Sequence, residues 1–109
     1  MSELASKQCV PCRGGVPPLT AAEIHPLHNQ VPSWTLVTTH HIEKVFNFPD
    51  FKTALDFVNK VGAIAEEQAH HPDIGLSWGG VEIVIYTHKV NGLTESDFIL
   101  AAKIDQIAA

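Results

Sequence analysis

The sequence predicts an α+β fold, a four-stranded antiparallel sheet with three helices packed on one face. Segments with an apolar period of two and segments of helical period follow one another in the order helix, two strands, helix, two strands, helix. Short, turn-rich connections between the paired strands are typical of hairpins, so the helices are left to cover one side of the sheet. The 109 residues fit one domain, which we expect at 19–109 behind an irregular arm at 1–18.

The first helix is expected to begin at about Ala21. The Gly/Pro-rich stretch 14–18 argues against regular structure just before it. Thr20 and Glu23 have the spacing of a capping box, in which each side chain bonds the backbone of the other. Pro26 lies where this helix would continue, so we expect the helix to bend or to stop early.

Two strands and a long helix are predicted next. Residues 34–37 are expected to form the first strand, and 42–48 alternate in polarity as a second strand does. Apolar residues between 51 and 65 recur at helical spacing. We therefore expect a helix that starts at Pro49-Asp50, ends near Ala69 and packs on the sheet.

The last third of the chain predicts a hairpin followed by a helix. Residues 74–78 alternate as a third strand, and Gly79-Gly80 suits a tight turn. The fourth strand is expected to run from 81 to His88. Thr94 and Asp97 then have the spacing of a cap for the last helix.

The balance of charge excludes several kinds of partner. Lys and Arg total 7 against 12 Asp and Glu, a formal charge of −5, which disfavours direct binding of a nucleic acid. No apolar run is long enough for a membrane span, and residues 1–7 do not resemble a secretory signal, so we expect a cytoplasmic protein. Val84 and Tyr86 make the second sheet face too apolar for water alone, which predicts contact with another copy of the chain.

The densest group of chemically active residues is Glu66-Glu67-Gln68-Ala69-His70-His71-Pro72-Asp73. Imidazoles accept and release protons near neutral pH. Glu66 and His70 are four residues apart, so on a helix we expect this carboxylate to contact and orient that ring. The hairpin would bring Pro72 and His88 to the same end of the sheet, and His70, His71 and His88 could then line one pocket. Trp78, at the far end of the hairpin, is expected to give support only.

Other interpretations of these histidines are a surface or core location, or a zinc site. Three imidazoles can bind zinc with one open position. The spacing disfavours zinc here, because the adjacent side chains of His70 and His71 point apart. His40-His41 is a comparable pair that opens a strand, without an acidic residue four positions earlier, and we interpret it as structural or solvated.

A second possible metal cluster comes from the N-terminal region. Its C-x2-C and H-x2-H spacing is close to that of a zinc finger, although the histidine pair is one residue tighter than usual. A proline between the histidines and the Gly/Pro-rich gap favour incidental spacing. The residues concerned are Cys9, Cys12, His25 and His28.

The spacing Glu66-x3-His70-His71-Pro72, with Trp78, His88 and Asp97 downstream, resembles the signature of the pterin-4a-carbinolamine dehydratases. Further positions resemble the family over nearly the whole chain from Cys9. They are Cys9-x-x-Cys12-x-Gly14-Gly15, Trp34, Phe46-x-Phe48, Phe51, Thr87-His88, Gly92-Leu93-Thr94 and Ala101-x-x-Ile104-Asp105.

The resemblance implies an enzyme, a hydro-lyase. Its reaction would dehydrate 4a-hydroxytetrahydropterin, such as 4a-hydroxytetrahydrobiopterin, to quinonoid dihydropterin plus water during tetrahydropterin recycling. It implies no metal and no organic cofactor, and a homodimer or homotetramer. Relatives also act as coactivators of a transcription factor or in Rubisco assembly, so a non-enzymatic binding or assembly protein is the alternative. The complete set of histidines favours the enzyme.

The resemblance also implies roles for individual residues. Two imidazoles would carry the proton transfers, His70 and His88, with the acid and base labels open. His71 would orient the substrate, and Glu66 would tune His70. Asp97 would hold the pocket edge or only cap the last helix. The other substrate-binding positions are Thr87 and Asp73.

Overall fold

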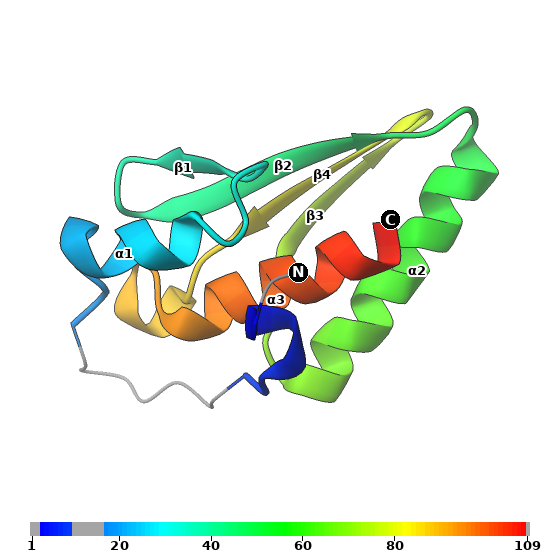
Figure 1. The fold of residues 1–109 in the computed structure, drawn as a ribbon. Coiled ribbons are helices and arrows are strands. Elements are labelled where there is room, and N and C mark those ends of the chain that lie inside the picture. Colours follow the sequence, from blue (N-terminus) through cyan, green and yellow to red (C-terminus); the bar gives the residue numbers. More distant parts are fainter. Residues whose placement is uncertain (1–2, 10–16, 109) are drawn as a thin grey trace.

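The computed structural model of the chain describes residues 3–9 and 17–108 (Figure 1). Its helices and strands follow the predicted order, with two additional 3-10 turns. No helix in these ranges is both long and apolar enough to cross a membrane. In chain order the elements are η1 (Glu3–Ser6), α1 (Ala21–His28), β1 (Thr35–Val37), β2 (His41–Asn47), α2 (Phe51–Gln68), β3 (Asp73–Ser77), β4 (Gly80–Ile85), η2 (His88–Val90) and α3 (Glu95–Ala108).

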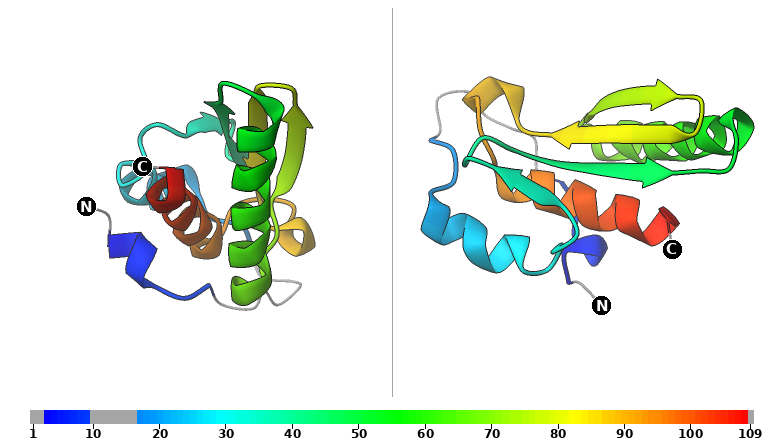
Figure 2. Two further views of the ribbon diagram at one scale, coloured as in Figure 1. Left: turned by 90° about the vertical axis from the view of Figure 1, so that its right-hand side faces the viewer. Right: turned by 90° about the horizontal axis from the view of Figure 1, so that it is seen from above.

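The strands form one antiparallel sheet in the order β1-β2-β4-β3. The chain passes from β2 through α2 to the edge strand β3, and β4 then returns to the centre beside β2 (Figure 2). Asp73 pairs with Val84, so the start of β3 lies beside the end of β4. The segments before β3 and after β4 therefore leave the sheet at the same end, as the hairpin prediction requires.

One face of the sheet is covered by the three helices (Figure 1), which confirms the predicted α+β fold. Val81, Ile83 and Ile85 of β4 are fully buried, while Glu82 between them is exposed. Full burial of one such apolar side chain stabilises the fold by about 1.5–3 kcal/mol. The period of two along β4 thus selects which face meets the helices.

The end of α2 is defined by a single backbone turn. Asp50 caps the other end, where its carboxylate accepts the Thr53 backbone N–H at 2.8 Å. At the C-terminal end, Ala69 adopts a left-handed conformation with φ 53°, so the helix stops at Gln68. This agrees with the predicted end near Ala69 and turns His70 away from the helical path.

The predicted turn of the hairpin is displaced by one residue. Ser77 pairs with Gly80, so Trp78 and Gly79 form the turn, where Gly79-Gly80 was expected. Glycine is suited to position 79, because a Cβ there would lie 3.0 Å from the carbonyl oxygen of Phe48.

The prediction that the fourth strand reaches His88 is wrong. The strand β4 ends at Ile85, and His88 begins η2. Ile42 of β2 pairs with Ile85 and β2 begins at His41, so the ladder cannot extend as far as Thr87. Thr87 closes a local turn, in which its N–H donates to the carbonyl of Gly92 at 2.8 Å.

The prediction of an irregular arm is wrong for its first part. Residues 3–6 form the 3-10 turn η1, which packs against α3. Leu4 is 1% exposed and belongs to the core, and Lys103 of α3 donates to the carbonyl of Ala5 at 2.9 Å. In the first helix, Thr20 and Glu23 make the predicted capping box.

The sheet face opposite the helices is only partly polar. Val45 is 56% exposed there, and Val84 and Tyr86 are half-buried. Contact between this face and a second copy of the chain stays a prediction.

Candidate active site

A pocket of about 280 Å³ lies between the loop that joins α2 to β3 and the segment that follows β4. Because both segments leave the sheet at the same end, residues distant in sequence face each other here. The pocket brings together the three imidazoles that the sequence predicted to converge. Its lining is Ala69, His70, His71, Tyr86, Thr87, His88 and Lys89.

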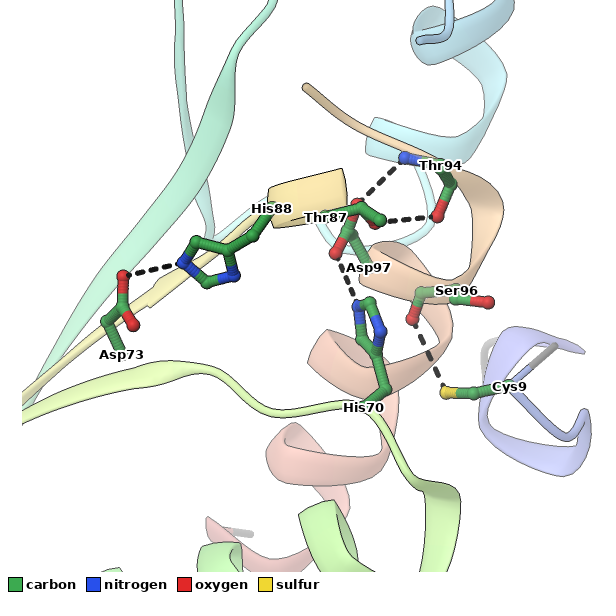
Figure 3. A network of polar contacts seen from close by, with 8 residues as sticks. All are labelled: Cys9, His70, Asp73, Thr87, His88, Thr94, Ser96 and Asp97. Carbon is green, nitrogen blue, oxygen red and sulfur yellow. Dashed lines mark hydrogen bonds and ion pairs between the residues drawn. The ribbon is translucent and has the colours of Figure 1, made fainter. Parts of the chain in front are cut away.

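His70 is anchored to a buried carboxylate. Its Nε2 lies 2.6 Å from Oδ1 of Asp97, a residue of α3 with no exposed surface (Figure 3). Only 11% of the His70 side chain is exposed. Within the described residues, every buried side-chain nitrogen or oxygen has a hydrogen-bond partner. Among these residues, the His70 ring is hydrogen-bonded to Asp97 alone. Nδ1 of His70 makes no hydrogen bond within the described residues and is therefore not fully buried.

The second oxygen of Asp97 is also fully engaged. Oδ2 accepts the hydroxyl of Thr87 at 2.9 Å and the backbone N–H of Thr94 at 2.8 Å (Figure 3). Because the Thr87 hydrogen is committed to Asp97, the Thr94 hydroxyl donates to Thr87 across 3.0 Å. Burial of a carboxylate is costly unless such donors surround it, and three of them fix Asp97 in one position.

Asp97 combines the two roles that the sequence left open. Its bond to the Thr94 backbone N–H is half of the predicted cap on α3. The bond to His70 makes the same carboxylate a support of the pocket. The two roles therefore do not compete.

The expected contact between Glu66 and His70 is replaced by another pairing. Oε2 of Glu66 lies 2.5 Å from Nε2 of His71. The rule for residues four apart fails because His70 is outside the helix, beyond the left-handed Ala69. Both partners are open to solvent, with 59% of the His71 side chain and 80% of the Glu66 side chain exposed.

His88 is held less tightly than His70. Its Nε2 is 3.5 Å from Oδ2 of Asp73, and more than half of each side chain is exposed. Figure 3 shows its ring between Asp73 and the pair formed by His70 and Asp97. The His88 ring also packs against the ring of Tyr86, with 4.1 Å between ring centroids.

Thr87 has little left with which to bind a ligand. Its N–H donates to Gly92, and its carbonyl accepts from Val90 and Gly92. Its hydroxyl is committed to Asp97 and its exposed area is 3%. Sequence reasoning missed Tyr86 and Lys89 as lining residues, although their positions on either side of Thr87-His88 are a usable signal.

The described members of the N-terminal metal cluster have other partners. Nε2 of His28 lies 2.6 Å from the carbonyl of Trp34, and His25 contacts Asn29. Cys9 contacts the carbonyl of Ser96 through its thiol at 3.5 Å. Cys12 lies outside the described residues, and no group of three or more potential ligands is found within them.

The pKa of the Cys9 thiol is raised to about 11. Burial is the main cause, because it disfavours the thiolate. Lys103 opposes this rise and the charge of Asp97 adds to it. Trp78, the predicted supporting residue, is 69% exposed in the hairpin turn and is not part of the pocket lining.

Comparison with known sequences identifies the family. Residues 17–107 match the model of the family described as pterin 4 alpha carbinolamine dehydratase. A protein of Rubrobacter xylanophilus, assigned by name as a pterin-4-alpha-carbinolamine dehydratase, is 58% identical over 107 residues, 98% of this chain and 100% of that protein. A protein of Rickettsia canadensis with the same assigned name is 51% identical, covering 96% and 97% of the two chains.

Solved structures agree with this assignment. A transcriptional coactivator/pterin dehydratase from Brucella melitensis superposes with a TM-score of 0.79 and 32% identity, covering 84% of this chain and 99% of that chain. A pterin dehydratase-like protein described as a RuBisCO assembly factor in the alpha-carboxysome has a TM-score of 0.61 at 24% identity, which shows a shared fold. The chain thus belongs to the pterin-4-alpha-carbinolamine dehydratase family, whose members are named for a hydro-lyase activity.

Proposed function

We propose that this protein dehydrates 4a-hydroxytetrahydropterin to quinonoid dihydropterin plus water by histidine acid–base catalysis. The observation that carries the proposal is the pocket in which three imidazoles converge, one of them fixed by a buried carboxylate. Its volume of about 280 Å³ suits a small molecule. Family membership supplies the class of substrate.

The reaction needs one proton donor and one proton acceptor. The bond from C4a to its hydroxyl breaks as that oxygen gains a proton and leaves as water. N5 loses its proton, and its electrons form the new double bond to C4a. Each positioned acid or base typically contributes ~10²–10⁴-fold to such a step.

His70 fits the role of base. Neutral His70 donates its Nε2–H to the ionised carboxylate of Asp97, which leaves Nδ1 without hydrogen and ready to accept one. The negative charge of Asp97 then stabilises the imidazolium that forms. Two further donors, the Thr87 hydroxyl and the Thr94 N–H, keep that carboxylate from moving, so the His70 ring is held in place.

His88 fits the role of acid. Its partner Asp73 stands 3.5 Å away and can accept the hydrogen of the ring Nε2. Both groups are solvent-exposed, so His88 can recover a proton from water after each turnover. With His70 as base and His88 as acid, His70→Gln should remove the acidic limb of the pH–rate profile and His88→Gln the alkaline limb. If the two roles are exchanged, each variant should remove the other limb.

His71 lines the open side of the pocket, and Glu66 contacts it from outside the lining. Their side chains are more than half exposed, so a bound substrate can displace water from them. In this proposal His71 orients the pterin ring, and Glu66 keeps the imidazole in position through its bond to Nε2. Asp73 serves the substrate indirectly, through His88.

The direct test is the decay of 4a-hydroxytetrahydropterin generated in situ by an aromatic amino-acid hydroxylase. We expect the wild-type protein to accelerate the decay in proportion to its concentration, and the His70→Ala variant to lose most of that acceleration while keeping its circular-dichroism spectrum. A wild-type protein that leaves the decay unchanged would reject dehydration, and an unchanged His70→Ala rate would remove His70 from the mechanism.

A non-enzymatic binding or assembly role is the second candidate, because the solved relative from Brucella melitensis is described as a transcriptional coactivator as well as a pterin dehydratase. It predicts no acceleration and stable association with a larger protein.

We also propose a cytoplasmic role in tetrahydropterin recycling and a homo-oligomer that covers Val45 on the outer sheet face. Light scattering of wild type and Val45→Glu tests the last point, since the charge should reduce the mass.

A further inference from the structure

A second group of rings extends from the pocket to the turn between β1 and β2. The ring of Tyr86 lies 4.1 Å from that of His88 and 4.5 Å from that of His40, measured between centroids. His40 belongs to a pair that the sequence indicated as structural or solvated. In the structure it is one Tyr86 ring away from His88, although the two histidines are 48 positions apart.

His40 also holds the far end of the turn that carries His88. Its Nε2 lies 2.9 Å from Oδ1 of Asn91. Asn91 ends η2 in a left-handed conformation, and its N–H donates to the carbonyl of His88 at 3.2 Å. His40 therefore contacts the His88 segment on both sides, through Tyr86 before it and through Asn91 after it.

The orientation of His40 is itself fixed. Its Nδ1 lies 2.9 Å from Nδ1 of His41, so these two nitrogens share one hydrogen. Nε2 of His41 lies 3.1 Å from the Glu43 carboxylate, to which it donates. Both ring nitrogens of His40 therefore contact side chains, which restricts the rotation of its ring.

A residue with a left-handed backbone conformation lies close to each of His40, His70 and His88. Among the described residues, three that are not glycine have positive φ: Thr38, Ala69 and Asn91. Ala69 precedes His70, Asn91 follows His88, and Thr38 lies two residues before His40. A β-branched threonine at φ 52° is uncommon, and such strain persists where the surroundings enforce it, often at functional sites.

We propose that His40 and Tyr86 are positioning residues for His88. The long contact of His88 with Asp73 does not determine the orientation of the His88 ring. Packing against the ring of Tyr86, which itself packs against His40, restricts that orientation. The proposal rests on the proposed function for its kinetic consequence only. Its structural consequence, the orientation of the His88 ring, is independent of any reaction.

The test combines NMR signals of the histidine rings with dehydration kinetics in Tyr86→Leu, Tyr86→Phe, His40→Ala and, as a matched control, His25→Ala on the exposed first helix. We expect Tyr86→Leu and His40→Ala to shift the His88 ring signals, leave those of His70 in place, and lower kcat on the order of tenfold with a smaller change in KM. Tyr86→Phe keeps the ring and should leave the His88 ring signals in place. His25→Ala should retain wild-type signals and kinetics.

Unchanged His88 signals in both Tyr86→Leu and His40→Ala would overturn the proposal, as would a fall in kcat without such a shift. Shifts in His70 as well as His88 would indicate general unfolding of the site, and would equally reject a specific positioning role. If the wild type proves to have no dehydratase activity, the proposed function fails while the NMR arm still decides whether His40 and Tyr86 orient His88.

Discussion

The adjacent residues His70 and His71 each pair with a carboxylate, and the two pairs differ in their exposure to solvent. His70 meets Asp97 at 2.6 Å, with 11% and 0% of the two side chains exposed. His71 meets Glu66 at 2.5 Å, with 59% and 80% exposed. The distances are alike, so the surroundings of each pair determine what it can do.

Burial makes the difference chemical. Charges interact more strongly where water is excluded, and a desolvated carboxylate that loses its partner is left uncompensated. An exposed pair is screened by water and salt, and contributes about 0–1 kcal/mol to stability. The inner pair is suited to moving a proton along a fixed path, and the outer pair to meeting a ligand that arrives from solvent.

Replacement of the inner carboxylate should have the largest effect. Asp97→Asn removes the charge that supports imidazolium at His70 and turns an acceptor of three hydrogen bonds into a group with donors of its own. We expect kcat to fall at least ~10²-fold and the free energy of unfolding to fall by about 1–3 kcal/mol. Steady-state kinetics and urea unfolding measure the two, with Asp56→Asn, an exposed carboxylate outside the pocket lining, as the control. A change in kcat of less than threefold would show that burial gives Asp97 no special role.

Replacement of the outer carboxylate should act mainly on binding. Glu66→Gln leaves a side chain that can still accept a hydrogen bond from His71, so we expect kcat within a few-fold of wild type and a higher KM. The free energy of unfolding should change by less than about 1 kcal/mol, because the pair is exposed. Kinetics at low and at high salt check this, since screening should remove the remaining effect. A loss of kcat as large as that in Asp97→Asn would erase the distinction between the pairs.

The charge of Asp97 should also affect the pKa of the Cys9 thiol. This effect is smaller, and it can be measured without substrate. Burial and the nearby carboxylate raise the pKa of this thiol to about 11 from 9.0. Alkylation of a Cys12→Ser protein should therefore remain slow until the pH approaches 11. Adding Asp97→Asn should lower the pKa measured from the rate. If the pKa of Cys9 is the same in the Cys12→Ser/Asp97→Asn protein as in Cys12→Ser, the charge of Asp97 does not raise the pKa of Cys9.

The same thiol gives a pH dependence of stability with a definite sign. Because the pKa is raised in the folded state, the folded protein retains the proton that the unfolded chain loses from pH 9.0 upward. Stability contributed by Cys9 is therefore complete below pH 9 and decreases as the pH rises toward about 11. Urea unfolding at pH 8 and pH 10.5, compared with Cys9→Ala, measures the change, and a Cys9→Ala curve parallel to wild type would reject it.

The fold could be predicted because its signals are local and repeated. Val81, Ile83 and Ile85 recur at every second position, and the capping box of Thr20 and Glu23 marks a helix start directly. The convergence of the three site histidines also followed from the hairpin, since its geometry dictates which ends meet.

The pairings within the site could not be predicted. Helical spacing assigned Glu66 to His70, whereas one left-handed residue, Ala69, gave that imidazole to Asp97 and Glu66 to His71. A single φ angle of an alanine leaves no mark in the sequence. The contact of His40 with Tyr86 was equally hidden, because it depends on where a tight turn places one ring.

We expect the buried pair to carry the chemistry and the exposed pair to carry substrate binding. Parallel measurement of kcat and KM for His70→Gln and His71→Gln, with in situ-generated 4a-hydroxytetrahydropterin, tests it most directly. We expect kcat to fall ~10²-fold or more in His70→Gln, and mainly KM to rise in His71→Gln. Equal losses of kcat in the two variants, or a larger loss for His71→Gln, would contradict it.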